Sequence, residues 1–292
     1  MILQPLLLLW LLFGFIASVE AKISYLGYKP KGMNPTLYDP KDDPIVQLDQ
    51  NTFTDTVFCS TRANCSAFIV EFYSDWCGHC RDYSSIYKAV ARDVKDWNKV
   101  VTIAAINCAD PTNSDVCRDN EIYWYPAIKY FPRNARSVEN SSKIRAEMSV
   151  AEMRDQITTT VLTDYAKNRY PDWPKFTFLP YVATYTELWR DVPKEINMLA
   201  IVFENSPQSP IGAQLLMDLM KYNNRLFGRR SLSDHPLAKA HHILDFPTLT
   251  VFKRGEKSPV LKADQDRTGG VTRWILYSGL RRGPYDRKQL VI

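Results

Sequence analysis

The sequence predicts an α/β protein made of two copies of one small domain, on two observations. The segments IYWYPAIKYF (122–131) and ILDFPTLTVF (243–252) share a pattern of isoleucine, aromatic residue, proline and apolar strand. They lie 121 residues apart, which is the length of one small domain and indicates a duplication. Before each copy, continuous apolar strands alternate with helical runs, a pattern typical of a mostly parallel sheet covered on both faces.

The elements expected around the two repeats follow one order. In the first copy, strands over 67–73 and 100–107 flank a helix over about 80–97, and the proline segment leads into a strand, a hairpin partner and a closing helix. Ser149 followed by Glu152 has the spacing of a capping box and predicts the start of that closing helix.

In the second copy, a strand over 197–204 precedes a helix over 211–224, and the closing helix is predicted over 271–280. Prolines at 171, 174 and 180 interrupt regular structure between the copies, so the boundary is placed near residue 170. At 292 residues and 45% hydrophobic composition, the chain can bury two cores.

The first 21 residues have most features of a cleaved secretory signal peptide: eleven apolar residues (6–16) and then Val19 and Ala21, placed for cleavage after Ala21. An uncleaved membrane anchor is the alternative, although a span requires about twenty apolar residues. We therefore expect no stable span after cleavage, and a location in the lumen of the endoplasmic reticulum or Golgi or outside the cell. Sequons at Asn64 and Asn140 fit that location and predict glycosylation.

The charge pattern gives no sign of a nucleic-acid partner. The net charge is +5, and lysines and arginines are interleaved with acidic residues along most of the chain. No basic stripe that could follow a phosphate backbone stands out.

Cys77 and Cys80 form a C-x-x-C motif in SDWCGHCRDY, directly after the strand predicted over 67–73. A zinc site needs a second closely spaced ligand pair, and Cys108 and Cys117 are too far apart to be one. A c-type haem needs histidine directly after Cys80, where Arg81 stands. We therefore expect no metal, and a structural disulfide is the remaining alternative to a redox pair.

The position of Cys77 favours a redox role. Unpaired amides and the helix dipole at a strand-to-helix junction favour an anionic sulfur, and His79 can add positive charge that stabilises the reduced thiolate. Cys80, one turn into the helix, is expected to be the more buried, resolving thiol. Glu71 is the candidate for a buried carboxylate that moves the proton of Cys80, and an exposed glutamate on an edge strand is its alternative.

The motif VEFYSDWCGHC, with Pro126 forty-nine residues after Cys77, resembles a thioredoxin-fold domain of the protein disulfide isomerase type. In that fold the proline peptide is cis and faces the active-site sulfurs, which implies substrate-binding roles for Trp76, Tyr125 and Pro126. The segment DVKDWNKVVTIAAINCADPTNSDVCRDNEIYWYPAIKYF resembles more closely the quiescin sulfhydryl oxidase family. This resemblance covers about residues 35–290.

The resemblance implies two tandem thioredoxin-fold domains, a redox-active one within 22–170 and one without cysteines within 171–292. It also implies a structural disulfide between Cys108 and Cys117, with a redox role as the alternative. A bridge between Cys59 and Cys65 is then the default for the remaining pair. The chain departs from both families at Ser85, where a proline that kinks the active-site helix is usual.

By resemblance, the chain is a thiol-disulfide oxidoreductase that introduces disulfides into secretory proteins, and its partners are protein dithiols. In the sulfhydryl oxidases the electron acceptor is a C-terminal helical flavin domain of the Erv type, which reduces oxygen to hydrogen peroxide. No cysteine follows Cys117, so FAD is expected only in such a domain and not in these 292 residues. The alternatives are an isomerase that reshuffles disulfides and a non-catalytic thioredoxin-like binding or chaperone module.

Overall fold

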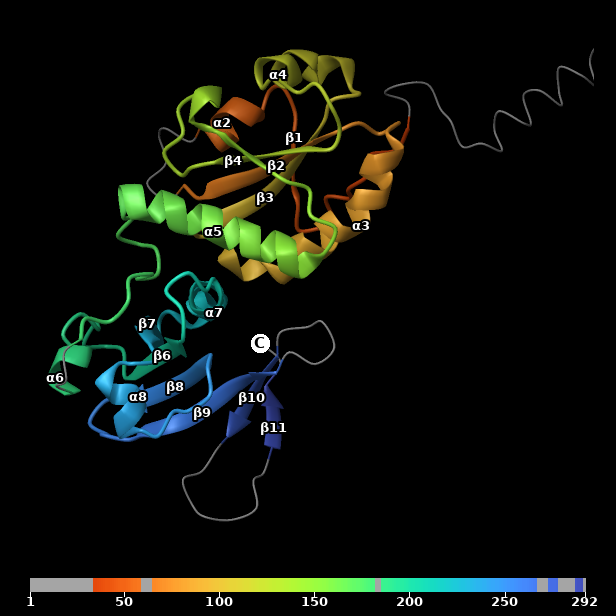
Figure 1. The fold of residues 1–292 in the computed structure, drawn as a ribbon. Helices are drawn as coiled ribbons and strands as arrows, with labels where there is room; N and C mark the ends of the chain where they lie inside the picture. Colours follow the sequence, from red (N-terminus) through yellow and green to blue (C-terminus); the bar gives the residue numbers. More distant parts are fainter. Residues whose placement is uncertain (1–33, 59–64, 182–184, 267–272, 278–286, 291–292) are drawn as a thin grey trace, which may run out of the picture.

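The computed structural model describes residues 34–58, 65–181, 185–266, 273–277 and 287–290. The predicted signal peptide, Cys59 and Asn64 lie outside these ranges. Figure 1 shows two α/β domains, each built on its own sheet, with helices α5 and α7 between them. The predicted fold of two tandem α/β copies is confirmed.

The first sheet has the strand order β1-β3-β2-β4-β5. Its strands are β1 (Val46–Leu48), β2 (Ala67–Tyr73), β3 (Val101–Asn107), β4 (Ala127–Phe131) and β5 (Ser142–Ile144). β2 and β1 run parallel to β3, whereas β4 pairs antiparallel with β2 and β5. Every residue of the central strand β2 is buried, as its continuous apolar sequence predicts.

Helices cover both faces of this sheet (Figure 1). They are α2 (Phe53–Val57), α3 (Gly78–Asp93), α4 (Ser114–Asp119) and α5 (Val150–Asn168), with 3-10 turns η1 (Lys95–Trp97), η2 (Pro111–Asn113) and η3 (Val138–Asn140). The helix expected over about 80–97 thus begins earlier, at Gly78, and its last turn is the separate η1. The predicted cap of α5 is confirmed, because Ser149 Oγ accepts from the Glu152 amide at 3.2 Å and donates to the Glu152 carboxylate at 2.7 Å.

The second sheet has the order β11-β10-β9-β8-β6-β7. Its strands are β6 (Met198–Glu204), β7 (Leu226–Leu232), β8 (Thr248–Lys253), β9 (Pro259–Asp266), β10 (Arg273–Tyr277) and β11 (Arg287–Leu290). The helical elements are α6 (Tyr185–Leu188), α7 (Ile211–Asp218), η4 (Leu219–Tyr222) and α8 (Pro236–Ala240). The strand predicted over 197–204 is present, and the helix predicted over 211–224 begins as expected but ends at Asp218 and continues as the 3-10 turn η4 to Tyr222.

The closing helix predicted over 271–280 is wrong. Residues 273–277 form strand β10, which pairs antiparallel with β9 and with β11. The sequence Arg-Trp-Ile-Leu-Tyr is rich in aromatic and β-branched residues that favour strands, and partners on both sides satisfy the backbone of β10. The second copy therefore extends its sheet where the first copy adds a helix.

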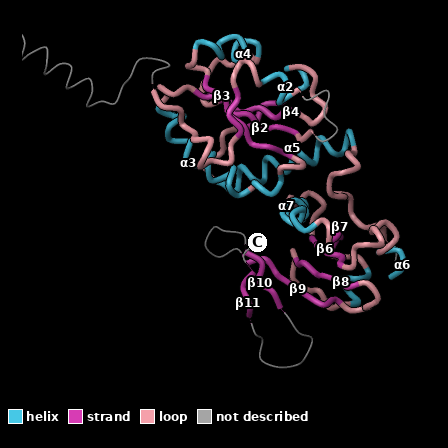
Figure 2. Tube along the Cα trace, turned by 180° about the vertical axis from the view of Figure 1, so that it is seen from behind, coloured by secondary structure: helices cyan, strands magenta, loops and turns pink. Residues whose placement is uncertain are grey.

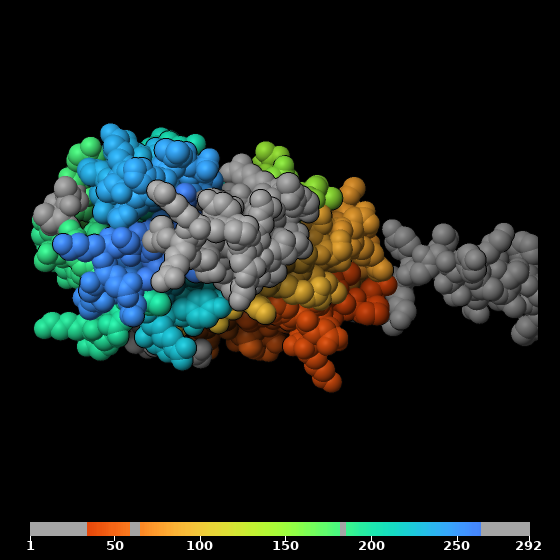
Figure 3. All heavy atoms as spheres, turned by 90° about the horizontal axis from the view of Figure 1, so that it is seen from below, coloured from red at the N-terminus to blue at the C-terminus, as the bar shows by residue number. Residues whose placement is uncertain are grey.

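The domains meet through α5, η1, α7 and η4 (Figures 1 and 2). Trp97 Nε1 donates to Asp218 Oδ1 at 2.7 Å, and Arg154 pairs with both Asp93 and Asp218. The Arg154 guanidinium also lies 4.6 Å from the centroid of the Trp97 ring. In space-filling view, atoms of the second domain lie directly against those of the first (Figure 3).

Among the described residues, none of the helices combines the length and the apolar character that a membrane crossing needs.

Candidate active site

Cys77 and Cys80 lie at the start of α3, and both are free thiols. Cys77 is the N-cap residue and is half-buried, whereas Cys80, in the first turn, is fully buried. The turn before them is fixed from both sides, since the Arg81 guanidinium donates to the Asp75 carbonyl at 2.7 Å and the Cys77 amide donates to the Ser74 carbonyl at 3.1 Å. The two sulfurs are thus unequal, with one open to a partner and one shielded.

The cis-proline segment lies against the exposed sulfur. The peptide bond between Tyr125 and Pro126 is cis, and Cys77 Sγ donates to the Tyr125 carbonyl at 3.8 Å. The indole of Trp76 is 37% exposed and packs edge-on against the Tyr125 ring, with centroids 6.4 Å apart. Three residues predicted to bind substrate therefore surround one side of Cys77.

Burial sets the chemistry of Cys80. It raises the pKa of the Cys80 thiol well above its usual value, because an anion there would lose its hydration; a backbone hydrogen bond at Ser74 opposes the shift. The charge of Glu71 raises the pKa of the thiol further. Cys80 therefore stays protonated unless a neighbouring group takes its proton.

Glu71 lies at the middle of β2, between β3 and β4, so the edge-strand alternative is excluded. Its side chain is fully buried and points to the same face as Ile69 and Tyr73, which belong to the core cluster that contains Cys80. Burial raises the pKa of the Glu71 carboxyl to about 8, and a hydrogen bond from Tyr38 partly offsets this. A carboxyl with that pKa can both give and take a proton near neutral pH.

Tyr38 is the site residue that sequence reasoning missed. Its hydroxyl donates to Glu71 Oε2, while Glu71 Oε1 has no hydrogen-bond partner among the described residues. The Tyr38 ring packs edge-on against Tyr73 at 5.2 Å and tilted against Tyr87 at 5.8 Å. Tyr38 precedes Glu71 by 33 residues and belongs to no motif, so nothing in the sequence pointed to the contact.

The other predicted residues have more peripheral positions. His79 is exposed in the first turn of α3. Ser85, where the related families have proline, donates to the Asp82 carbonyl at 3.2 Å, and α3 continues through it. A serine at this place keeps the backbone donor that a proline would remove.

A disulfide joins Cys108, just after β3, to Cys117 in α4. Cys65 is also disulfide-bonded, and because Cys59 lies outside the described residues, their pairing stays a prediction. Asn140 is exposed at the end of η3, and its glycosylation, like that of Asn64, stays a prediction.

Among the residues that the structure describes, no cluster of metal-ligating side chains competes with the redox interpretation. Within the described ranges, no three histidine, cysteine or acidic residues come together as a metal site would require. A C-x-x-C pair at a helix start and a facing cis-proline are the parts that thiol-disulfide exchange uses, and that exchange needs no cofactor of its own.

Residues 44–158 match the family model named Thioredoxin. The first domain therefore has a thioredoxin-type fold. Sulfhydryl oxidase 1 of Cavia porcellus is 29% identical over 75% of this chain and 34% of its own length. Sulfhydryl oxidase 1 of Gallus gallus is 29% identical over 88% of this chain and 33% of its own length. The predicted resemblance to the sulfhydryl oxidases is confirmed, and the chain spans about a third of the length of these relatives.

Solved structures support the tandem fold. The crystal structure of ERdj5 form I superimposes with a TM-score of 0.52 at 14% identity, and covers 86% of this chain and 28% of that chain. Full-length ERdj5 gives a TM-score of 0.51 at 13% identity over 86% of this chain and 30% of that one. At this identity the likeness is one of fold.

Proposed function

We propose that this chain is the substrate-oxidising part of a flavin-linked thiol oxidase that introduces disulfides into secretory proteins. One observation carries the proposal: Cys77 is half-exposed beside the cis Pro126, while Cys80 is buried in a core cluster and Glu71 is buried on the face of β2 that packs against it. The similarity to sulfhydryl oxidases supports the oxidising direction of the reaction.

The reaction starts from the oxidised pair. A client thiolate attacks Cys77 Sγ, so that the bond between Cys77 and Cys80 breaks and a client–Cys77 disulfide forms. Cys80 leaves as a buried thiolate and takes a proton from Glu71. The Glu71 carboxyl carries this proton below a pH of about 8. A second client thiolate then attacks the client sulfur and releases Cys77, so the client loses two electrons and the pair gains them.

Reoxidation runs through an acceptor disulfide. Cys77 attacks that disulfide, and Cys80 then resolves the mixed disulfide after losing its proton, which Glu71 takes as a base. We propose that the acceptor is the C-x-x-C pair of a flavin domain, whose bound FAD would supply the reduction of oxygen to hydrogen peroxide. No residue of this chain is assigned to that step.

We further propose that the protein works in the secretory pathway or outside the cell. The signal-like segment at 1–21 and the sequons at Asn64 and Asn140 support this location.

The test uses the full chain with its cysteine pair oxidised and a reduced protein client. Wild type should consume one client dithiol per chain, and Cys77→Ser should consume none. Cys80→Ser is first converted to a mixed disulfide between Cys77 and a small aromatic thiol. It should then trap the client on Cys77. Thiol loss and mass spectrometry measure both outcomes. If oxidised wild type consumed client thiols no faster than Cys77→Ser does, the chain would instead be a binding or chaperone module.

Disulfide isomerisation is the second candidate, because the same half-exposed Cys77 can attack a client disulfide once the pair is reduced. Two assays separate the candidates: reactivation of a scrambled client in a glutathione buffer, and oxygen consumption when a sulfhydryl oxidase flavin domain is added. We expect the flavin domain to give the faster turnover.

A further inference from the structure

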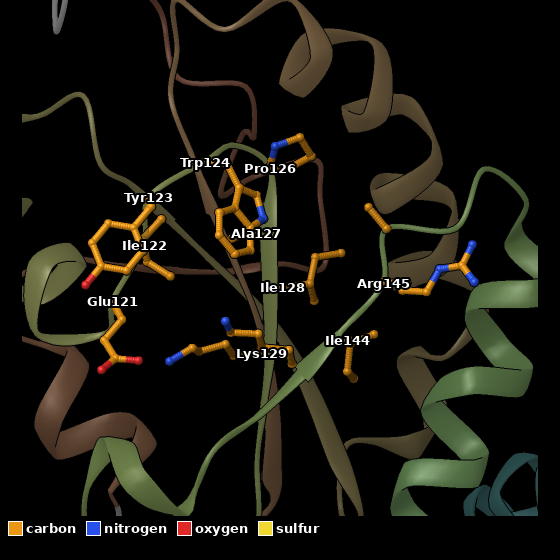
Figure 4. Close-up of a pocket in the computed structure, with 12 residues that line it drawn as sticks. Glu121, Ile122, Tyr123, Trp124, Pro126, Ala127, Ile128, Lys129, Ile144 and Arg145 are labelled. Atoms are coloured by element: carbon orange, nitrogen blue, oxygen red, sulfur yellow. The ribbon is translucent and has the colours of Figure 1, made fainter.

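A pocket of about 390 Å³ adjoins the cis-proline on the outer part of the first sheet (Figure 4). We call it the lysine pocket, after Lys129 on β4 and Lys143 on β5. Glu121, Tyr123, Trp124 and Pro126 also line it. Tyr123 and Trp124 are 78% and 57% exposed, so the pocket has an open aromatic wall.

The two lysines of the pocket bring two positive charges close together, which is unfavourable unless an anion lies between them. They are direct partners in the β4–β5 register, so their side chains leave the same face of the sheet side by side. Like charges in this arrangement repel each other. Lys129 is only 5% exposed. Burial lowers the pKa of its ammonium group, and the charge of Lys143 lowers this pKa further.

Among the described residues, neither ammonium group has a counter-ion in contact. The side chains of Lys129 and Lys143 form no ion pair and donate no hydrogen bond there, whereas the pocket's Arg145 pairs with Glu147 at 3.4 Å. Lys143 Nζ lies 5.0 Å from the centroid of the Trp124 ring, which holds it over an aromatic face.

Glu121 is the acidic group of the pocket. Its charge raises the pKa of Lys129 and so favours the ammonium form, but the two do not form an ion pair. In Figure 4 the Glu121 carboxylate lies on the same side of β4 as Trp124, and Arg145 points to the other side. The pocket lining thus holds one carboxylate and two ammonium groups, and the pocket volume leaves room for a second carboxylate.

The pocket is also close to the reacting sulfur. Trp124 and Pro126 flank Tyr125, whose carbonyl accepts from Cys77 Sγ at 3.8 Å. Lys129 follows Pro126 by three strand residues, which is about 10 Å along β4 at 3.3 Å per residue. An extended client with its cysteine at Cys77 can place a side chain about three residues away over the lysine pocket.

We propose that the lysine pocket binds an aspartate or glutamate side chain of the client polypeptide, about three residues from its reacting cysteine. A carboxylate there accepts hydrogen bonds from Lys129 and Lys143, and its aliphatic stem packs against Trp124. The client's oxidation rests on the function proposed above, whereas its binding to the pocket does not.

The first experiment measures binding alone. Peptides carry serine in place of the reacting cysteine, with glutamate or glutamine three residues to either side, and their affinity for the full-length protein is measured by titration. The glutamate peptide should bind about tenfold more tightly, the ratio that 1.4 kcal/mol gives, and Lys143→Gln should remove most of this preference. The matched control Lys99→Gln, an exposed lysine outside the pocket, should keep it.

The second experiment uses the same peptides with a cysteine pair, and follows their oxidation by the oxidised chain. A glutamate preference in rate, abolished by Lys143→Gln, supports the inference. Equal affinity of both serine peptides overturns it, and so does a pocket that binds inorganic phosphate or free glutamate but not the glutamate peptide. Failure of both cysteine peptides to react, despite a binding preference, would count against the proposed function alone.

Discussion

The two domains differ most at the start of the helix that follows the central strand. In the first domain, α3 begins at Cys77 and Gly78, where the half-buried sulfur lies. In the second, the Glu204 carboxylate occupies the start of α7: Oε1 accepts from the Gly212 amide at 2.9 Å, and Oε2 pairs with Arg230 Nε at 2.7 Å. A carboxylate thus holds the start of α7, where the helix dipole favours a negative group, and a cysteine stands at the start of α3.

The two helix starts differ in how closely the group there is enclosed. Glu204 and Arg230 are both buried and fill the helix start permanently. A Cβ on Gly212 would lie 2.1 Å from Glu204 Oε2, whereas one on Gly78 would meet nothing within 4 Å. The second helix start is closed by its own side chains, and the first is left open for a client.

The central strands differ in the same sense. In the first domain, the residue after the cis-proline, Ala127, pairs with Phe72. In the second, the residue after the cis-proline, Thr248, pairs with Phe203. Val202, one residue before Phe203, therefore takes the place that Glu71 has in the first domain. Both domains keep the cis-proline, at Pro126 and Pro247. The cis-proline is therefore common to both domains, while a carboxyl at the position of Glu71 is found only in the domain with the cysteine pair.

The largest effect is expected on stability, from breaking the buried Glu204–Arg230 pair at the start of α7. Glu204→Ala leaves Arg230 buried without its partner, which should lower the free energy of unfolding of that domain by about 3–5 kcal/mol. Urea denaturation of the full chain measures it. Glu256→Ala, which removes an exposed pair with Lys253, should change stability by less than about 1 kcal/mol, and a similar loss in both variants would contradict the comparison.

The next effect concerns the buried carboxyl of the first domain. Glu71→Gln removes the group that we propose moves the proton of Cys80, so reoxidation of the reduced pair at pH 7 should slow by about 100-fold. Stopped-flow measurement with a small disulfide gives the rate, and alkylation of Cys77 by a small reagent serves as the control because it does not need Cys80. An unchanged reoxidation rate would separate Glu71 from the chemistry.

The same variant has a pH signature in stability. Burial raises the pKa of Glu71 from 4.5 to about 8, so between these values the folded protein holds a proton that the unfolded chain has released. The free energy of unfolding should therefore fall as pH rises from about 4.5 to about 8, and Glu71→Gln should remove that fall.

The smallest effect is expected at Tyr38. Tyr38→Phe removes the hydrogen bond that lowers the pKa of Glu71, so the pH profile of reoxidation should move to higher pH, with a stability loss of about 1 kcal/mol. Tyr87→Phe is the matched control, since the Tyr87 hydroxyl donates to the backbone carbonyls of Ile69 and Ala104. It should lose similar stability without the pH shift; equal shifts in both variants would remove Tyr38 from the site.

Local patterns in the sequence were enough to predict several elements of the fold and the position of the cysteine pair. β2, the cap of α5 at Ser149, and the cysteine pair at a strand-to-helix junction depend on spacing within a few residues. The aromatic-proline repeat likewise marked the two segments that carry cis peptides, although the cis geometry itself was implied for Pro126 by the resemblance to the thioredoxin fold. Such features follow from neighbours along the chain, so they are visible without the fold.

Other features depend on neighbours in space. Residues 273–277 became a strand because β9 and β11 lie on either side, and the burial of Glu71 under Tyr38 joins segments 33 residues apart. The pairing of Lys129 with Lys143 needed the register of two strands. Burial and cross-strand register arise when distant segments pack together, and they set the proton chemistry and the charge beside Cys77.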